Sequence, residues 1–212
     1  MSQLNAEKAL IFRITHISNV GWILANGLHC RASNHLDPNY HEIGNPELIA
    51  KRANRNIPVD PGGTLSNYIP FYFTPYTPMM LNIKTGYGGV TQTPMRDLVI
   101  LVSSLRKVSE MDIAFVFSDR HAYLQAADFS SDLGELGRID WKILQTRDFK
   151  RDPNDFEKVE RYQAEALIYG YMPITALSGI VCYREPQREY LNGLAKAAEI
   201  NVDIKAIPGW YV

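Results

Sequence analysis

A glutamate set among apolar residues is the feature of this sequence best suited to chemistry. Glu165 lies in the run Arg161-Tyr162-Gln163-Ala164-Glu165-Ala166-Leu167-Ile168. Burial disfavours the charged form of a carboxyl group, so a carboxylate in such a place can be held as a functional acid or base. The alternative, a charge on the polar face of an amphipathic element, fits this run equally well. Glu160 lies in a more polar context, typical of a surface charge, and is the second candidate carboxylate.

Two clusters of basic residues are candidates for phosphate contacts. The first cluster holds Lys51, Arg52 and Arg55, and the second includes Arg147, Arg151 and Arg161. Arginine can contact pyrophosphate or a DNA phosphate through two parallel hydrogen bonds. For any single arginine a solvated surface position is the commoner role. The net charge of −1 argues against a general attraction to nucleic acid but leaves room for a local basic face.

A histidine and an asparagine follow the first predicted strand, residues 9–14. His16, at the end of that strand, can hydrogen-bond a ribose hydroxyl, and Asn19 can contact an amide or a ribose. A lone histidine is more often a satisfied structural residue, and that alternative stays open. Ser18 is the predicted N-cap of a helix that follows, and Gly27 is predicted to end it.

An aromatic and proline-rich segment occupies residues 68–80. It holds five aromatic residues, three prolines and two methionines. Proline fixes its own φ and biases the preceding residue toward extended backbone, which argues against a long helix. The segment is therefore either a buried edge strand that leads into a turn or a wall of stacking surfaces around a planar ligand such as nicotinamide or a nucleobase.

The remaining pattern predicts one compact α+β domain over residues 1–212. A short helix is expected at 45–55 within a long polar loop, and a turn at 86–89. Apolar strands are expected at 98–102, 114–117 and within 174–183, and 202–207 closes the sheet. Residues 185–199 predict a helix, whereas 159–170 fit a strand or a helix.

Composition narrows the class of protein. With 46% hydrophobic and 21% charged residues, the chain is typical of a soluble globular protein. Its apolar runs are too short for a membrane span, and its first residues are too polar for a secretory signal. Cys30 and Cys182 lack CxxC spacing and predict reduced thiols in a cytoplasmic protein. The histidines near Cys30 match no metal-ligand spacing, so no metal site is predicted.

Together these motifs resemble the DarT family of DNA ADP-ribosyltransferase toxins. The order and spacing match along nearly the whole chain, and the aromatic segment is the most specific part. Tyr76 stands where arginine is expected. The matching residues are Ile14-Thr15-His16-Ile17-x-Asn19, Gly27-Leu28, Ile43-Gly44, Lys51-Arg52, Tyr68-x-Pro70-Phe71-Tyr72-Phe73-x-Pro75-x-x-Pro78-Met79, Phe117-Ser118-Asp119-x-His121-Ala122 and Gln163-Ala164-Glu165.

The resemblance implies an ADP-ribosyltransferase fold with a central, mostly antiparallel, split sheet flanked by helices. It implies NAD as co-substrate, transfer of ADP-ribose to a base of single-stranded DNA, typically thymidine, and release of nicotinamide. The expected partner is a macrodomain antitoxin, and the expected state is a monomer without metal or membrane attachment. The alternatives are guanine, RNA or protein as acceptor, or a non-catalytic single-stranded nucleic-acid-binding domain.

Residue roles follow from the same resemblance. Arg52 matches the active-site arginine and Glu165 the catalytic glutamate, with Lys51 or Arg55 and Glu160 as alternatives. The implied cofactor-binding residues are His16, Asn19, Gly27, Leu28, Arg52, Phe71 and Tyr72. The candidates for DNA contact are Tyr40, Arg55, Tyr76, Met79, His121, Arg147, Arg151 and Arg161, with Tyr87 and Tyr123 as further stacking candidates.

Overall fold

A large β-sheet runs through the molecule. The computed structural model describes residues 4–211. Its strands are β1 Leu10–His16, β2 Leu28–His29, β3 Tyr68–Tyr72, β4 Leu98–Ser104, β5 Phe115–Ser118, β6 Phe129–Ser130, β7 Glu165–Tyr169, β8 Tyr171–Met172, β9 Gly179–Cys182 and β10 Ile204–Ala206. Eight of them form one sheet in the order β10-β9-β4-β1-β3-β7-β5-β6, and β2 pairs with β8 separately. Only the β9–β10 pair is parallel within this described sheet.

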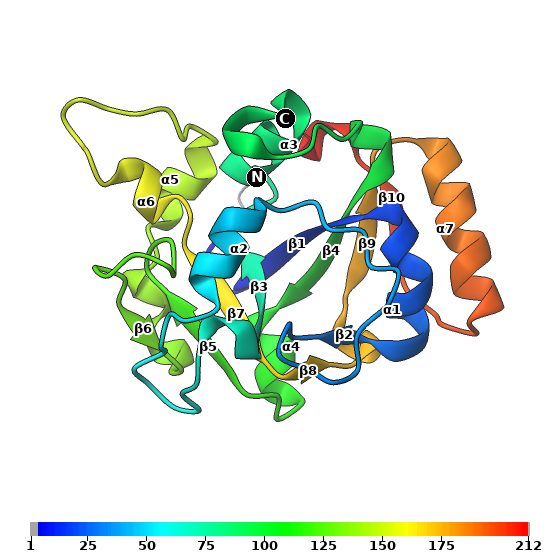
Figure 1. Cartoon of the computed structure of the whole chain (residues 1–212), viewed down its shortest axis with the longest axis horizontal. Coiled ribbons are helices and arrows are strands. Elements are labelled where there is room, and N and C mark those ends of the chain that lie inside the picture. The colour runs from blue at the N-terminus through cyan, green and yellow to red at the C-terminus, as the bar shows by residue number, and fades with distance from the viewer. Residues whose placement is uncertain (1–3, 212) are drawn as a thin grey trace.

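Short helices flank the sheet (Figure 1). They are α1 Val20–Asn26, α2 Pro46–Arg52, α3 Pro78–Thr85, α4 Leu105–Glu110, α5 Trp141–Thr146, α6 Lys158–Arg161 and α7 Glu185–Ala197. The longest, α7, lies beside β10 and α1 at one side of the molecule. No helix within residues 4–211 is long and apolar enough to cross a membrane.

The sheet opens between its two central strands, β1 and β3. These strands pair only at Phe12 and Tyr72, whereas β1 pairs with β4 along its whole length. Pro70 of β3 has no N–H to donate to a ladder. Arg13 of β1 instead donates from Nη1 to the Pro70 carbonyl oxygen at 2.9 Å. The predicted split, mostly antiparallel sheet is therefore confirmed.

The aromatic segment contains both a central strand and a helix. Because β3 lies between β1 and β7, the prediction of an edge strand is wrong. The missed helix, α3, begins at Pro78, and the Thr77 hydroxyl caps it by accepting from the Met80 N–H at 3.1 Å. Proline suits a first helical position because the N–H it lacks would have no helical partner there. Gly86, at φ 74°, ends α3 and begins the predicted turn.

Local signals explain the helix that follows β1. A 3₁₀ turn over Ile17–Asn19 precedes α1, and the His16 side chain caps that turn. The prediction of Ser18 as the N-cap of the helix is wrong, because α1 begins after Asn19, whose side chain makes no capping hydrogen bond. Gly27 ends α1 at φ 77°, as predicted. A Cβ at Gly27 would lie 2.8 Å from the Met172 carbonyl oxygen of β8, so only glycine allows this approach.

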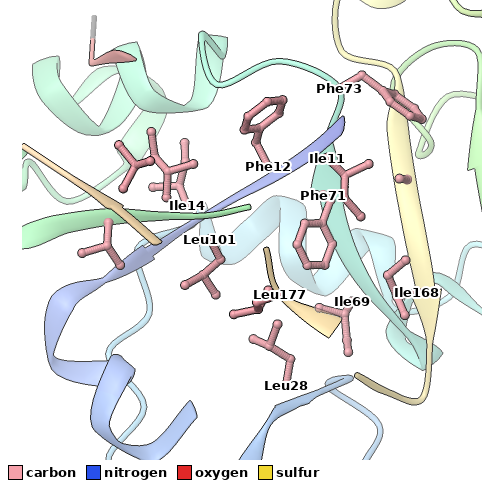
Figure 2. Packing of buried hydrophobic residues seen from close by; sticks show 14 of the residues in the cluster. Ile11, Phe12, Ile14, Leu28, Ile69, Phe71, Phe73, Leu101, Ile168 and Leu177 are labelled. Carbon is pink, nitrogen blue, oxygen red and sulfur yellow. The ribbon is translucent and has the colours of Figure 1, made fainter. Parts of the chain in front are cut away.

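The apolar core fixes the register of the central strands. Ile11, Ile69, Phe71 and Ile168 from β1, β3 and β7 pack together and are almost fully buried (Figure 2). Burying each such side chain stabilises the fold by about 1.5–3 kcal/mol. A slip of one residue would turn every side chain of a strand to the other face. The core therefore holds Glu165 of β7 opposite Tyr72 of β3.

Candidate active site

Glu165 is the first residue of β7, and its side chain is only 2% exposed. It lies opposite Tyr72 on β3 and opposite Ser118 on β5. The ambiguous region 159–170 thus resolves into helix α6 and then strand β7. The reading of Glu165 as a charge on a polar outer face is wrong, because neighbouring strands enclose it on both sides.

Arg52, the last residue of α2, holds Glu165 through two hydrogen bonds. Nη1 donates to Oε1 at 2.9 Å, and Nη2 donates to Oε2 at 2.7 Å. This fork-on-carboxylate geometry is the strongest form of a side-chain ion pair. Asn45 starts α2 by accepting from the Leu48 N–H at 2.9 Å, which sets the direction of the helix. Residues 113 positions apart in the sequence therefore meet in one buried pair.

The two alternative cations are engaged elsewhere. Lys51 is exposed and pairs with Glu47 at 2.6 Å. Arg55 donates to the Gln125 side chain and to the Leu124 carbonyl oxygen, each at 3.0 Å. Among the three basic residues, only Arg52 contacts Glu165.

The segment after β5 supplies two further contacts to Glu165. The backbone N–H of Ala122 donates to Oε1 at 3.0 Å, and Nδ1 of His121 lies 3.5 Å from the same oxygen. Nδ1 of His121 also accepts from the Tyr123 N–H at 3.2 Å, which favours the tautomer with its proton on Nε2. His121, expected from the sequence to stack on DNA bases, lies instead against the Arg52–Glu165 pair.

The electrostatics of this cluster keep Glu165 charged. Burial raises the pKa of Glu165, but the Arg52 guanidinium and the Ala122 N–H outweigh it and hold that pKa below its ordinary value. Burial lowers the pKa of Arg52, and Glu165 more than offsets this. Burial also lowers the pKa of His121, so its ring is neutral near pH 7. Tyr72 has its pKa raised by burial and by Glu165, and its hydroxyl donates to Sδ of Met79 at 3.7 Å.

His16 and Asn19 lie together at the end of β1. The His16 ring stacks on that of His41, with centroids 3.8 Å apart and planes at 9°. Asn19 is 1% exposed. Its Nδ2 donates to Thr15 and to the His41 carbonyl oxygen, and its Oδ1 accepts from the His41 N–H. The Asn19 amide therefore fixes the backbone that carries His41, and both of its N–H groups already have partners.

The three remaining cofactor candidates also have internal packing contacts. Phe71 is fully buried, and because it is adjacent to Tyr72 in β3 it points to the other face of the strand. Phe71 and Tyr72 therefore face opposite sides of the sheet. Leu28 is buried in the core, and Gly27 packs against β8 through its backbone.

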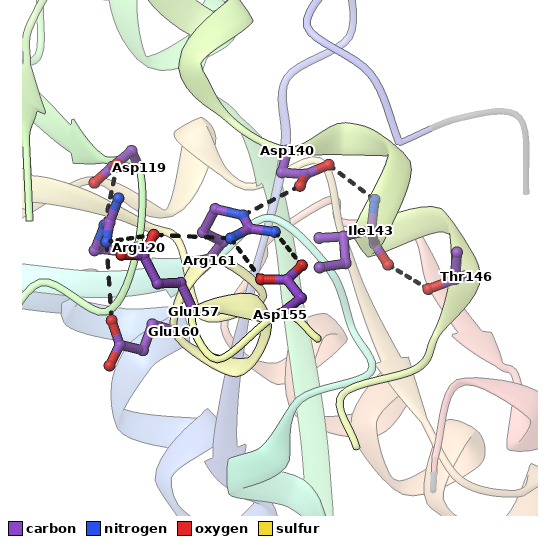
Figure 3. A network of polar contacts seen from close by, with 9 residues as sticks. All are labelled: Asp119, Arg120, Asp140, Ile143, Thr146, Asp155, Glu157, Glu160 and Arg161. Carbon is purple, nitrogen blue, oxygen red and sulfur yellow. Dashed lines mark hydrogen bonds and ion pairs between the residues drawn. The ribbon is translucent and has the colours of Figure 1, made fainter. Parts of the chain in front are cut away.

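Several DNA-contact candidates also have internal partners. Tyr76 is 4% exposed, donates its hydroxyl to the Gly209 carbonyl oxygen at 2.8 Å, and carries the Arg147 guanidinium 4.0 Å above its ring. The expectation of an exposed Tyr76 is wrong. Arg161 pairs with Asp155 and Asp140, so its charge is already neutralised (Figure 3). Tyr40, Tyr87 and Arg151 are exposed, and Met79 and Tyr123 are partly buried.

The sequence interpretation missed three contributors to this region. Arg13 bridges the split in the sheet, His41 stacks on His16, and the Ala122 N–H binds Glu165. Arg13 could have been found, because it is a lone charge in the apolar strand Leu10–His16, the same signal that marks Glu165. The stacking of His41 and the backbone N–H of Ala122 have no comparable signal in the sequence.

Comparison with known proteins decides the family. A family model described as ssDNA thymidine ADP-ribosyltransferase, DarT, matches residues 12–212. This chain belongs to the DarT family. It is 50% identical over 210 residues to a DNA ADP-ribosyl transferase of Escherichia coli O127:H6 (strain E2348/69 / EPEC), with 99% of this chain and 96% of that protein covered.

Solved DarT structures have the same fold. A structure of Thermus sp. 2.9 DarT in complex with ADP-ribosylated ssDNA matches with a TM-score of 0.89 and 31% identity, covering 97% of each chain. A structure of that protein in complex with NAD⁺ matches with a TM-score of 0.85 and 30% identity over 97% and 98% of the two chains. The expected DNA ADP-ribosyltransferase family is thus confirmed, and the expected co-substrate, NAD, is bound in that Thermus relative. Among residues 4–211, no cluster of three His, Cys, Asp or Glu residues could hold a metal ion.

Proposed function

We propose that the Arg52–Glu165 pair is the centre at which this chain transfers ADP-ribose from NAD to thymidine in single-stranded DNA. The observation that carries the proposal is a fully buried carboxylate, held ionised by a two-fold arginine contact, at the first residue of a central strand. Burying such a pair is costly, and well-packed apolar residues would often serve stability as well or better. A reaction that needs a fixed negative charge would explain why this chain has a buried ion pair here.

The chemistry requires that charge. As the bond between nicotinamide and ribose breaks, positive charge develops at the anomeric carbon. A preorganised carboxylate can stabilise that charge and accept a hydrogen bond from a ribose hydroxyl. Glu165 supplies the carboxylate because its lowered pKa keeps it ionised at neutral pH.

The acceptor must also lose a proton. The new bond joins the anomeric carbon to thymine N3, and the proton of N3 has to leave to a base. Arg52 stays protonated at any physiological pH, so it cannot be that base. We assign the proton to Glu165, and we assign to Arg52 the orientation of phosphate and the stabilisation of the negative charge that develops on the thymine.

NAD would be bound by side chains around the split sheet. His16, at the end of β1, and Tyr72, opposite Glu165 on β3, are the candidates for direct contact. Asn19 would act by holding the His41 backbone, and Gly27 by allowing the close packing of β2 on β8. Phe71 would support Tyr72 from the core.

Single-stranded DNA would be held by exposed aromatic and basic side chains. Arg151 and Phe156 both lie on the segment 147–157, which projects beside α6 (Figure 1). Phe156 is 86% exposed, an unusual position for so large an apolar ring. Tyr40 is exposed and accepts from Nη2 of Arg13 at 3.4 Å. A duplex would first have to open, because thymine N3 is buried in its base pair.

We propose a toxin role, because such a modification would obstruct DNA replication. Bulky modification of a template base blocks pairing at N3, and a cell that carries this enzyme needs a means to remove the group. The partner we propose is a macrodomain antitoxin that hydrolyses the bond between ADP-ribose and the base. We propose that the chain acts as a monomer.

Oligonucleotide-dependent release of nicotinamide tests this function. We expect wild-type protein to release nicotinamide from NAD in the presence of a thymidine-containing single strand, and far less with the matching duplex. Glu165→Gln should abolish the release, whereas Glu189→Gln, an exposed change on α7, should leave it intact. Equal release with and without DNA, or by the Glu165→Gln variant, would contradict the proposal.

A further inference from the structure

Arg120 directly precedes His121, whose ring lies against the Arg52–Glu165 pair. Its side chain is 15% exposed and meets three carboxylates. Nε donates to Asp119 at 3.1 Å, and Nη1 lies 3.4 Å from Glu157 and 3.8 Å from Glu160. A guanidinium with so many acidic neighbours and so little exposure has a restricted orientation.

The backbone around Arg120 leads directly to Glu165. The Arg120 carbonyl oxygen accepts from the Ser118 hydroxyl at 2.7 Å, and the next N–H, of His121, donates to the Glu160 carbonyl oxygen at 3.0 Å. The following N–H, of Ala122, is the one that donates to Glu165. The side chain of Arg120 and the backbone of His121 thus join the same two pieces of chain, residues 119–122 and helix α6.

The acidic neighbours of Arg120 extend this connection outward. Oε2 of Glu157 lies 3.9 Å from Nη1 of Arg161 as well as 3.4 Å from Arg120. Arg161 in turn holds Asp155 by two hydrogen bonds, at 3.1 and 2.7 Å (Figure 3). The segment 147–157, which carries the exposed Arg151 and Phe156, is therefore tied by charge to the residues that contact Glu165.

We propose that Arg120 is a positioning residue for the transfer reaction. Its ion pairs with Glu157 and Glu160 hold residues 120–122 so that the Ala122 N–H and the His121 ring stay against Glu165. This inference rests on the proposed function for its kinetic consequence, whereas its structural consequence can be measured without any reaction.

The physical cause is local charge balance. Without the Arg120 cation, the carboxylates of Asp119, Glu157 and Glu160 would repel one another around one point. The backbone of residues 119–122 would relax away from α6, and Ala122 would shift from Glu165. A displacement of about 1 Å at a reacting group can lower a rate by about a hundredfold.

Kinetics of Arg120 variants give the first test. We expect Arg120→Gln to lower kcat about tenfold to a hundredfold, with KM for NAD changed less than about twofold. Arg120→Lys should recover part of the loss, because it restores the charge but not the planar fork. A Glu157→Gln, Glu160→Gln double variant should lose kcat similarly, and combining it with Arg120→Gln should add little. The matched control is Arg138→Gln, which breaks an exposed pair with Glu135.

Hydrogen exchange at the Ala122 amide gives the second test and needs no substrate. We expect its protection to fall at least about tenfold in Arg120→Gln, while the core strands keep theirs. Unchanged kcat and unchanged Ala122 protection in a folded Arg120→Gln protein would overturn the inference, as would strictly additive losses in the combined variant. Failure of the wild-type protein to release nicotinamide with DNA would instead count against the proposed function alone.

Discussion

Two arginine–carboxylate systems include residues of the stretch 161–165, and they differ in burial and in the number of charges. The inner one is a single pair, Arg52 with Glu165, whose side chains are 16% and 2% exposed. The outer one joins Arg120 and Arg161 to five carboxylates whose side chains range from 15% to 60% exposed. Arginine and carboxylate side chains are therefore paired in two environments of different polarity, although the two systems are only a few residues apart in the sequence.

The difference shows what each system can contribute. Removing one partner of a buried pair leaves an uncompensated charge and costs about 3–5 kcal/mol. Each exposed pair contributes about 0–1 kcal/mol and is weakened by salt. We therefore assign the chemistry to the inner pair and the positioning of backbone to the outer network. Three predictions test this division, and a fourth concerns a residue outside both systems.

The largest expected effect is on activity in Glu165→Gln. The amide is nearly the same size and can still accept from the Ala122 N–H, but it lacks the charge that stabilises the developing cation. We expect kcat for DNA-dependent nicotinamide release to fall by at least about a thousandfold. Glu160→Gln, on the outer network, should cost no more than about tenfold. A larger loss in Glu160→Gln than in Glu165→Gln would reverse the assignment of the two carboxylates.

Arg52→Gln should have the largest effect on stability, a loss of about 3–5 kcal/mol near neutral pH.

The stability loss of Arg52→Gln should depend on pH. In wild-type protein the pKa of Glu165 lies below its ordinary value of 4.5, so its stabilising contribution is present above pH 4.5 and is lost as the pH falls through the folded-state pKa. Without Arg52, burial raises that pKa, and the variant is penalised as the pH rises through it. Urea unfolding from pH 7 down to pH 4.5 should show the difference between the two proteins shrinking. A constant difference would mean that Glu165 is not the group involved.

The inner pair shows how far the sequence could predict the site. Glu165 could be found from its apolar neighbours alone, but the choice among Lys51, Arg52 and Arg55 could not be made. That choice depends on which side of α2 faces the sheet. A helix of seven residues is too short for its apolar periodicity to identify that side. Only the tertiary structure brings Arg52 to Glu165.

The outer network shows where sequence reasoning failed. Arg161 was expected to contact phosphate because it is a cation in a basic region, yet Asp140, 21 positions away, and Asp155 neutralise it. Tyr76 was expected on the surface and is covered by residues near the C-terminus, with Gly209 133 positions away. Partners this distant are set by packing, whereas the strands and the split sheet follow from local apolar patterns and from the family resemblance.

Arg161→Gln should have a smaller effect, in keeping with exposed pairs. We expect a loss of about 1 kcal/mol of stability at low ionic strength, because several partly exposed contacts are removed together. The loss should shrink in high salt, whereas that of Arg52→Gln should persist, because a buried pair is little screened. Thermal unfolding of the two variants at low and high salt measures this. Equal salt sensitivity in both would erase the distinction between inner and outer systems.

The smallest expected effect concerns His16, which belongs to neither system. Burial, with the adjacent His41, lowers the pKa of His16 from 6.5, so the unfolded chain binds a proton more readily than the folded one. The stabilising contribution is therefore complete above pH 6.5 and decreases as the pH falls below it. His16→Gln should remove part of the fall in the free energy of unfolding between pH 6.5 and pH 5, by less than about 1 kcal/mol because solvent screens the partly exposed ring. Denaturant unfolding at the two pH values measures this, and an unchanged pH dependence would show that His16 does not contribute to it.

Mass spectrometry of modified oligonucleotides tests the central claim most directly. Wild-type and Glu165→Gln proteins would each be incubated with NAD and four single-stranded pools, each lacking one base, alongside a matching duplex. We predict a mass gain of one ADP-ribose with the wild-type protein in every pool except the one without thymine, and no gain with Glu165→Gln. A gain in the thymine-free pool, or an active Glu165→Gln protein, would contradict thymidine transfer at the Arg52–Glu165 pair.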